Sequence, residues 1–153
     1  MEPLDEFDRK ILVALQKDGR LTSHQLAEAT ALSASQCARR RRRLEQLGII
    51  KSYRACLSKR KLGLGISAFI QVSLNNHDQK GIEAFTHLLE VNPCILEACK
   101  LTGRTDFLLR VVTADLDEMN RLISEILLRH PSVSHVQSHI ALEWLKEDGA
   151  LPV

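Results

Sequence analysis

The chain has 153 residues, 44% of them hydrophobic, which is ordinary for one globular domain or two small ones. Its net charge of +2 hides an uneven distribution: residues 1–61 carry 14 Lys and Arg against seven Asp and Glu, whereas residues 62–153 carry seven against 12. A basic first part and an acidic second part are typical of a polyanion-binding module joined to a module with another task.

Several classes of protein are excluded by what the sequence lacks. The four cysteines form no CxxC pair and no zinc-finger spacing, so no metal site is predicted. The acidic start, MEPLDEFD, is unlike a signal peptide, and no stretch has the ~20 apolar residues of a membrane span. No nucleophile–base pair or phosphate-binding glycine loop is present either. We therefore expect a cytoplasmic protein that is not an enzyme and needs no cofactor.

Three helices are predicted in the first part of the chain. The first runs from Asp5 to Asp18, with Asp5 as its cap and Gly19 as its stop. A second, short helix begins at Thr22 or Ser23, and the turn at residues 30–32 leads into the third. Three helices with a tight turn between the last two match the helix-turn-helix pattern.

The third helix contains five consecutive arginines, residues 39–43. Ser33 and Gln36 form an S-x-x-Q capping box at its start, and Gly48 provides a left-handed stop at its end. At 100° per residue, Cys37 and Leu44 share one face and Arg39 lies on the opposite one. This helix is predicted either to present guanidinium groups to DNA or to be a solvated basic face, and its position in the helix-turn-helix favours DNA.

The remaining elements complete an α+β fold. Residues 49–57 alternate in polarity and predict a wing or a connecting strand, and residues 58–61 form a basic linker. From there the order is strand, helix, strand, strand, helix, strand, a ferredoxin-like βαββαβ domain whose sheet has one face covered by helices. We expect a winged helix-turn-helix domain over residues 1–61, a ferredoxin-like domain over residues 62–153, and a partner on the bare face of the sheet.

At this point the sequence resembles the Lrp/AsnC family of leucine-responsive regulators along nearly all its length. The matching blocks in the first domain are Leu4-Asp5, residues 8–12 (DRKIL), 15–20 (LQKDGR), 32–37 (LSASQC), 43–45 (RLE), 48–50 (GII) and 53–55 (YRA), and residues 62–63 (LG) match at the domain boundary. In the second domain, Thr102-Gly103 and residues 106–111 (DFLLRV) resemble the family's glycine loop. Blocks in this order, across both domains, make the resemblance highly specific.

The resemblance implies a prokaryotic, nucleoid-associated transcription factor with a DNA-binding head and an effector domain. Members of the family dimerise through their sheets, often assemble into octamers, and commonly bind an amino acid where effector domains of neighbouring dimers meet. It predicts a regulator of a palindromic double-stranded DNA operator, modulated by an amino-acid effector. The alternative is a ligand-independent, nucleoid-organising DNA-binding protein.

The predicted DNA contacts lie on the arginine helix and just after it. Ser35 and Gln36 lie where the helix enters the groove, and Gln36 is suited to an adenine edge. The other predicted contacts, to phosphates and guanine edges, come from basic side chains: Arg39, Arg40, Arg42, Arg43, Lys51 and Arg54, with Tyr53 beside them. Of these, Arg39, Arg42 and Arg43 are expected to point outward. Arg41 lies near the seam residue Cys37, so we expect it to snorkel or to pair with a carboxylate such as Asp5 or Asp8.

The predicted effector site, carried over from the resemblance, combines the glycine loop with the last strand. Its residues are Gly103, Arg104, Thr105, Asp106, Ser138 and His139. Glycine permits a tight loop whose amides accept a carboxylate. Asp106 is either the partner of the ligand's α-ammonium group or an aspartate that caps the loop. Arg104 departs from the acidic or small residue of many relatives, which argues against a cationic effector.

Overall fold

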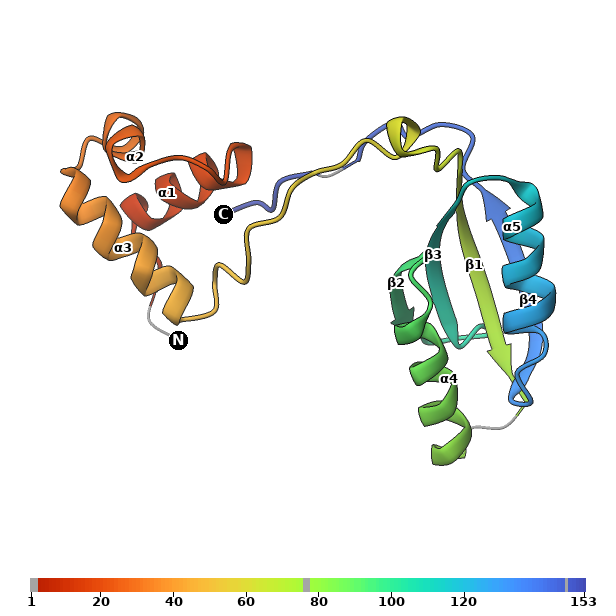
Figure 1. Cartoon of the computed structure of the whole chain (residues 1–153). Coiled ribbons are helices and arrows are strands. Elements are labelled where there is room, and N and C mark those ends of the chain that lie inside the picture. The colour runs from red at the N-terminus through yellow and green to blue at the C-terminus, as the bar shows by residue number, and fades with distance from the viewer. Residues whose placement is uncertain (1–2, 76–77, 148) are drawn as a thin grey trace. The chain divides into compact units, whose positions relative to one another are not determined.

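The computed structural model describes residues 3–75, 78–147 and 149–153, and their contacts form two compact units (Figure 1). The first unit consists of residues 1–56 and the C-terminal segment 146–153, and the second of residues 57–145. The sequence placed the boundary at residue 61 and the C-terminal segment in the second domain. In the structure that segment makes its contacts with the first unit.

Three helices make up the first unit: α1 (Glu6–Lys17), α2 (Ser23–Thr30) and α3 (Ala34–Gln46). Each begins with a capping box, in which Asp5, Thr22 or Ser33 accepts a hydrogen bond from the backbone three residues on. Between α2 and α3 the chain turns through Ala31, whose φ of 58° is left-handed. Gly48 ends α3 with a φ of 68°.

The core of the first unit lies where the apolar stripes of the three helices meet. It is formed by six buried side chains: Ile11, Leu12, Leu15, Leu26, Cys37 and Leu44. Cys37 and Leu44 therefore lie on the inner face of α3, as their spacing predicted. This packing leaves the opposite face of α3 open to solvent.

The C-terminal segment is fastened to α1 by the side chain of Gln16. Its Nε2 donates to the carbonyl of Leu151 at 3.1 Å, and its Oε1 accepts from the backbone N–H of Leu151 at 2.6 Å. Leu151 and Val153 also line a cavity of about 420 Å³ with Leu12 and Leu15 of α1. Nothing local in the sequence indicates this pairing, because the two residues are 135 positions apart.

The second unit is a four-stranded antiparallel sheet with helices on one face. Its elements in chain order are β1 (Ile66–Leu74), α4 (Gln79–Val91), β2 (Ile95–Lys100), β3 (Phe107–Thr113), α5 (Leu116–Arg121) with the π-helical turn η2 (Leu122–Leu127), and β4 (Val133–Ile140). A short 3₁₀ turn, η1 (Arg60–Leu62), precedes them. The strand order β2-β3-β1-β4 is that of the expected ferredoxin-like βαββαβ fold, which the structure confirms.

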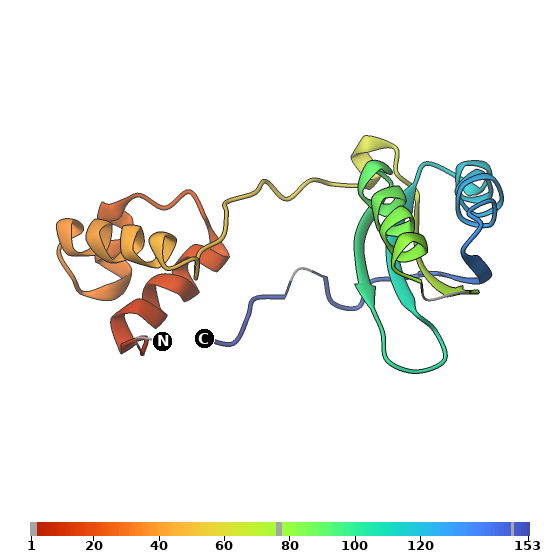
Figure 2. The same cartoon turned by 90° about the horizontal axis from the view of Figure 1, so that it is seen from below.

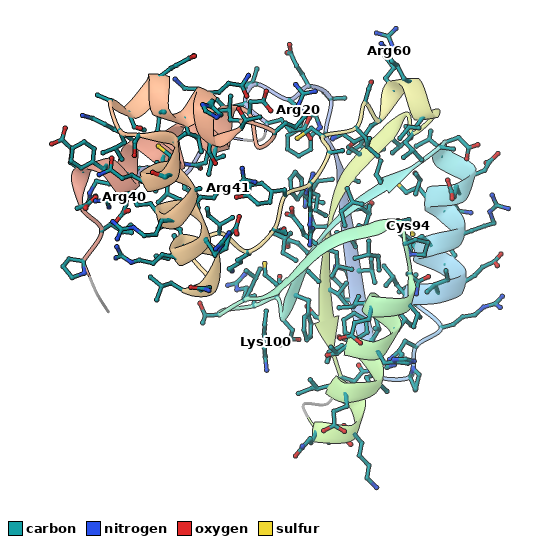
Figure 3. All side chains as sticks on the ribbon, turned by 60° about the vertical axis from the view of Figure 1, so that its left-hand side comes forward. Arg20, Arg40, Arg41, Arg60, Cys94 and Lys100 are labelled. Atoms are coloured by element: carbon teal, nitrogen blue, oxygen red, sulfur yellow. The ribbon has the colours of Figure 1, made fainter. Side chains whose placement is uncertain are left out.

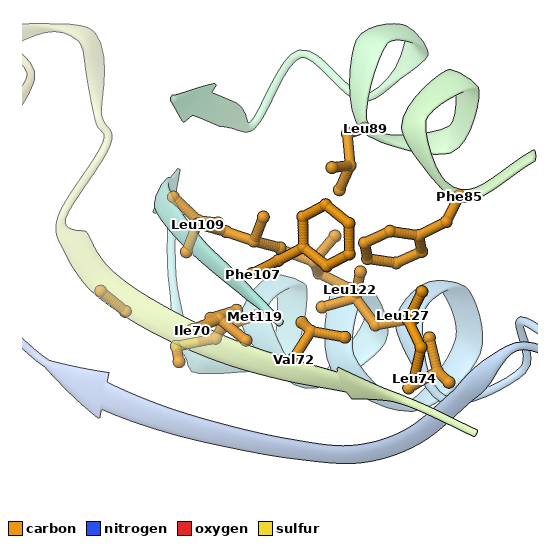
Figure 4. Close-up of a cluster of buried hydrophobic side chains, with 13 residues drawn as sticks. Ile70, Val72, Leu74, Phe85, Leu89, Phe107, Leu109, Met119, Leu122 and Leu127 are labelled. Atoms are coloured by element: carbon orange, nitrogen blue, oxygen red, sulfur yellow. The ribbon is translucent and has the colours of Figure 1, made fainter. Parts of the chain in front are cut away.

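Alternation along β1 explains how the sheet holds its helices (Figure 4). Ala68, Ile70, Val72 and Leu74 are buried against the helices, and the residues between them are only partly buried. Above them, Phe85 of α4 packs against Phe107 of β3 with ring centroids 5.1 Å apart. These contacts form one continuous core between the sheet and the two helices.

The other face of the sheet carries a row of side chains that no helix covers. In the register of the sheet, Glu97 lies opposite Arg110, Arg110 opposite Phe69, and Phe69 opposite His139. Trp144 packs on Phe69 with centroids 5.7 Å apart, and Lys59 Nζ lies 4.9 Å from the centre of the Trp144 ring. This surface is called the open sheet face below.

The expected strand over residues 49–57 is not formed. Residues 51–58 have no regular secondary structure and are exposed. The reason is physical: a strand needs a neighbour for its backbone hydrogen bonds, and no other described segment pairs with this one. None of the helices in the described part of the chain is long and apolar enough to cross a membrane. Within the same residues, no cluster of three or more metal-ligating side chains is found.

Candidate nucleic-acid interface and effector loop

The exposed face of α3 carries two arginines that are free to act on a ligand. Arg39 and Arg42 are exposed, and neither has a hydrogen bond or ion pair to any described residue. Both lie on the side of α3 away from Cys37, as predicted. Guanidinium groups in this position suit phosphates and guanine edges, because they present planar donors to both.

Arg40 and Arg43 are instead held by carboxylates of α1 and its cap. Arg40 Nη1 lies 2.7 Å from Asp5 Oδ2 and 2.8 Å from Asp8 Oδ1. Arg43 Nη1 lies 3.6 Å from Asp8 Oδ2, and its Nε is buried, so Arg43 does not point outward as expected. Asp8 itself is buried, which makes this a linked set of charges inside the unit. Breaking such a buried pair typically costs about 3–5 kcal/mol.

The two carboxylates differ in exposure. Asp5 keeps 47% of its side chain exposed and Asp8 only 1%. The backbone N–H of Asp8, together with Arg40, holds the pKa of Asp5 below its usual range. Asp5 is therefore charged at neutral pH, and it serves both as the cap of α1 and as an anion beside α3.

Arg41 pairs with a carboxylate, but not with one of those expected. Its Nε donates to Glu45 Oε1 at 3.2 Å and to the Tyr53 hydroxyl at 3.0 Å, and its Nη1 donates to the Leu21 carbonyl at 2.9 Å. Arg41 leaves α3 on a different side from Arg40 (Figure 3). Asp5 and Asp8 pair with Arg40, whereas Arg41 pairs with the carboxylate of Glu45, one turn along its own helix.

Tyr53 connects the segment after α3 to the helices. Its hydroxyl donates to Glu45 Oε1 at 2.9 Å, and the Arg41 guanidinium lies 4.7 Å from its ring centre. Burial, followed by the hydrogen bond to Glu45, raises the pKa of Tyr53. The ring also lies against Gly19, where an added Cβ would come within 3.1 Å of Tyr53 Cδ1. Lys51 and Arg54 flank Tyr53 and are exposed, which leaves their predicted DNA contacts available.

The first turn of α3 holds the two predicted polar contacts. Ser35 is exposed, and its hydroxyl lies 3.1 Å from that of Ser33. The side-chain oxygen of Gln36 accepts from the backbone N–H of Ser33 at 3.0 Å and from its hydroxyl at 3.0 Å. Only the amide nitrogen of Gln36 is left for a base, so a two-bond contact with adenine would require the capping box to open.

The loop that joins β2 to β3 contains four of the predicted effector residues and extends as a hairpin from the second unit (Figure 2). Gly103 has a φ of 120°, a conformation that favours glycine and fits the tight loop expected there. Arg104 is exposed. Asp106 Oδ2 accepts from the backbone N–H of Leu74 at 2.8 Å, so this carboxylate fastens the loop to the end of β1.

Residues of β1 that the sequence did not single out also contact this loop. Thr105 Oγ1 donates to Gln71 Oε1 at 3.3 Å, and Ser73 Oγ donates to the Arg104 carbonyl at 3.5 Å. The alternation of β1 was the available signal, because it places Gln71 and Ser73 on the open sheet face.

Ser138 and His139 occupy neighbouring positions on β4 and so point to opposite faces of the sheet. His139 lies opposite Phe69 on the open sheet face, whereas Ser138 lies opposite the buried Ile70. His135 and Gln137 lie opposite Ser73 and Gln71, which places them nearer to the loop along β4 than His139. The roles of the predicted effector residues stay predictions.

Comparison with known proteins identifies the class of molecule. Residues 4–51 match a winged helix-turn-helix DNA-binding family, and residues 67–151 match the Lrp/AsnC ligand-binding domain. The chain is 36% identical over 150 residues to the glutamate uptake regulatory protein of Zymomonas mobilis, covering 98% of this chain and 91% of the relative. It is also 36% identical over 144 residues to the leucine-responsive regulatory protein of Rhizobium meliloti, covering 94% of this chain and 92% of the relative.

The whole fold has a match among solved structures as well. A transcriptional regulator from Neisseria meningitidis, solved in complex with L-methionine, superposes with a TM-score of 0.94 at 39% identity, over 98% of this chain and 97% of that one. A helix-turn-helix unit joined to a ligand-binding sheet defines a two-domain DNA-binding transcriptional regulator whose activity an amino-acid effector modulates. The chain belongs to the Lrp/AsnC family. The relatives in this comparison are regulators.

Proposed function

We propose that the protein binds operator DNA through α3 and changes its DNA binding or assembly when L-methionine or a similar apolar amino acid binds at the loop of residues 101–106. The observation that carries this proposal is that one chain contains both features: exposed arginines on the outer face of α3, and, in an Lrp/AsnC ligand-binding domain, a loop that Asp106 holds to the end of β1.

On the DNA side, the proposed contacts are the exposed residues of α3 and the segment after it. Arg39 and Arg42 reach phosphates or guanine edges, Ser35 and Gln36 lie at the start of the helix, and Lys51 and Arg54 add backbone contacts. A dimer would place two copies of α3 in successive major grooves of a palindromic site. The basic charge of residues 1–61 supports attraction to DNA.

On the effector side, the proposed ligand is a zwitterion with an apolar side chain. The backbone amides beside Gly103 and the Arg104 guanidinium suit its carboxylate, and Asp106 suits its ammonium group. The L-methionine complex of the Neisseria meningitidis regulator supports this class of ligand. Arg104 argues against lysine or arginine, because like charges at one site repel.

Self-association through the open sheet face completes the proposal. Phe69, which Trp144 contacts, and Leu108 are only partly buried there, and no helix in the described part of the chain covers them. An uncovered apolar surface of this kind is commonly an interface. The assembly we expect is a dimer that builds an octamer, which acts on the chromosome in the cytoplasm of a prokaryote.

The test is thermal unfolding of the full chain with each of the twenty amino acids, in wild type, Asp106→Ala and the control Asp117→Ala. Asp117 is exposed on α5, away from the loop. Selective binding to the native state by L-methionine at 100 times its Kd stabilises it by about 2.7 kcal/mol, which is readily measured. The proposal predicts a shift in wild type and Asp117→Ala that is lost in Asp106→Ala.

Two other outcomes would redirect the proposal. A shift that survives in Asp106→Ala leaves Asp106 as a residue that only fastens the loop. A flat screen with DNA binding intact would favour a ligand-independent, DNA-organising protein.

A further inference from the structure

Arg41 pairs with Glu45, and the other four arginines of the run in α3 are divided between two environments. Arg39 and Arg42 are exposed and unpaired among the described residues, whereas Arg40 and Arg43 face carboxylates that come from α1 and its cap. Carboxylates therefore neutralise part of this run of like charges and leave the face of Arg39 and Arg42 without a carboxylate partner among the described residues. The division depends on α1, because the two carboxylates lie 32 and 35 positions from Arg40 in the sequence.

Burial keeps Arg40 and Arg43 in place. Asp8 has 1% of its side chain exposed and contacts both guanidinium groups, at 2.8 Å and 3.6 Å. If Arg40 turned outward to a DNA phosphate, this buried carboxylate would lose its nearest positive partner. Such a change is strongly unfavourable, because an uncompensated charge would remain in the interior.

Asp5 adds a barrier on the solvent side. A cavity of about 250 Å³ beside α3 is lined by Asp5, Arg39, Arg40 and Arg43. An incoming phosphate that approached these three arginines would meet the Asp5 carboxylate, which is 47% exposed and lies 2.7 Å from Arg40. Asp5 therefore competes with the phosphate for Arg40 and repels it at the same time.

We propose that Asp5 and Asp8 are positioning residues that withhold Arg40 and Arg43 from DNA, so that α3 acts on phosphates with Arg39 and Arg42. The effect falls on sequence-independent binding, because phosphate contacts supply nearly all of it. By limiting such contacts the carboxylates raise the ratio of specific to non-specific affinity. This role rests on the proposed function of α3 as the DNA-contacting helix.

The decisive variant is Asp5→Asn, because asparagine caps a helix as well as aspartate does but carries no charge. The matched control is Glu28→Gln, which removes one negative charge from an exposed position on α2 of the same unit. The experiment measures the affinity of the full chain for a duplex without an operator, as a function of salt concentration. Circular dichroism and thermal unfolding confirm that each variant is folded.

We expect Asp5→Asn to bind the non-operator duplex several-fold more tightly than Glu28→Gln, with a salt slope steeper by about one. The double variant Asp5→Asn with Arg40→Gln should return to the slope of Glu28→Gln. Equal slopes for Asp5→Asn and Glu28→Gln would overturn the inference. A smaller salt slope for the single variant Arg40→Gln than for wild type would also overturn it, because Arg40 would then already contact DNA in the wild-type protein. Wild-type protein that bound no duplex would instead contradict the proposed function.

Discussion

A single residue, Asp8, decides how much of the arginine run is available. Its buried carboxylate lies between α1 and α3 and accepts Arg40 directly. Helical periodicity separates the two faces of α3, but Arg40 and Arg43 lie at angles between those faces. Their side chains can therefore either extend into solvent or pair with a group on a neighbouring helix. The geometry of the neighbour settles their position. Charge counting in sequence therefore overestimates the basic surface that DNA meets.

The first prediction concerns the exposed arginines. Arg39→Ala and Arg42→Ala should each weaken DNA binding and reduce the salt slope by about one, since each removes one phosphate-neutralising group. Fold stability and assembly should stay within about 0.5 kcal/mol of wild type, because both side chains are exposed. Fluorescence anisotropy with labelled duplex, together with sedimentation, measures both. Normal binding by either variant would contradict the assignment of the DNA-contacting face.

A second prediction concerns how the ion pair between Glu97 and Arg110, on the open sheet face, makes the stability of the fold depend on pH. Arg110 Nη2 lies 2.6 Å from Glu97 Oε1, and this hydrogen bond lowers the pKa of Glu97. A carboxylate with a lowered pKa in the folded state stabilises the fold above its unfolded pKa, near 4.3, and loses that contribution as pH falls through the lower folded value.

Glu97→Gln should therefore have a lower free energy of unfolding than wild type at pH 7, and the two values should converge as the pH falls from about 5 to about 3. The difference is at most about 1 kcal/mol, because 67% of the Glu97 side chain is exposed to screening solvent. Chemical unfolding at each pH measures it. A difference that grew toward low pH would have the wrong sign and would contradict the ion pair.

At the level of helices and strands, the sequence predicted the three helices of the first unit and the order of elements in the second because the causes are local. Asp5 and Ser33 were identified as helix caps from the sequence, and each accepts the expected backbone hydrogen bond. The alternation of β1 placed one face in the core. Such features depend on residues three or four positions apart, which a sequence displays directly.

Features that depend on distant residues were missed or misassigned. Arg41 was expected to snorkel or to pair with a carboxylate such as Asp5 or Asp8; it does pair with a carboxylate, but that of Glu45. The docking of the C-terminal segment on Gln16 and the contact of Gln71 with Thr105 were not anticipated. Each depends on how elements pack against one another, and the periodicity of the sequence does not show which elements come into contact.

The third prediction concerns the C-terminal segment. Gln16→Ala removes both hydrogen bonds to Leu151 and should free residues 149–153 from α1. Because Gln16 is exposed, stability should fall by only about 1 kcal/mol or less. The backbone N–H of Leu151, which donates to Gln16, should then exchange its hydrogen with solvent several-fold faster than in wild type. Equal rates in Gln16→Ala, wild type and the control Glu28→Gln would show that these bonds do not hold the segment.

At the scale of the whole molecule, the chain joins two units that serve different partners. Residues 1–61, which comprise the three helices and the segment after them, carry a net charge of +7 and residues 62–153 a net charge of −5, so attraction to DNA is concentrated in the first part of the chain. Regulation needs the effector to alter the free energy of DNA binding by about 1–3 kcal/mol.

The most direct measurement is the affinity for a duplex selected by the protein from sheared genomic DNA, titrated with and without each of the twenty amino acids. We expect L-methionine or a close apolar analogue to change the affinity by about 5–150-fold, in either direction. The change should vanish in Asp106→Ala and persist in Asp117→Ala. Tight, salt-dependent binding that no amino acid alters would contradict the proposed regulation by an effector and mark the protein as a ligand-independent organiser of DNA.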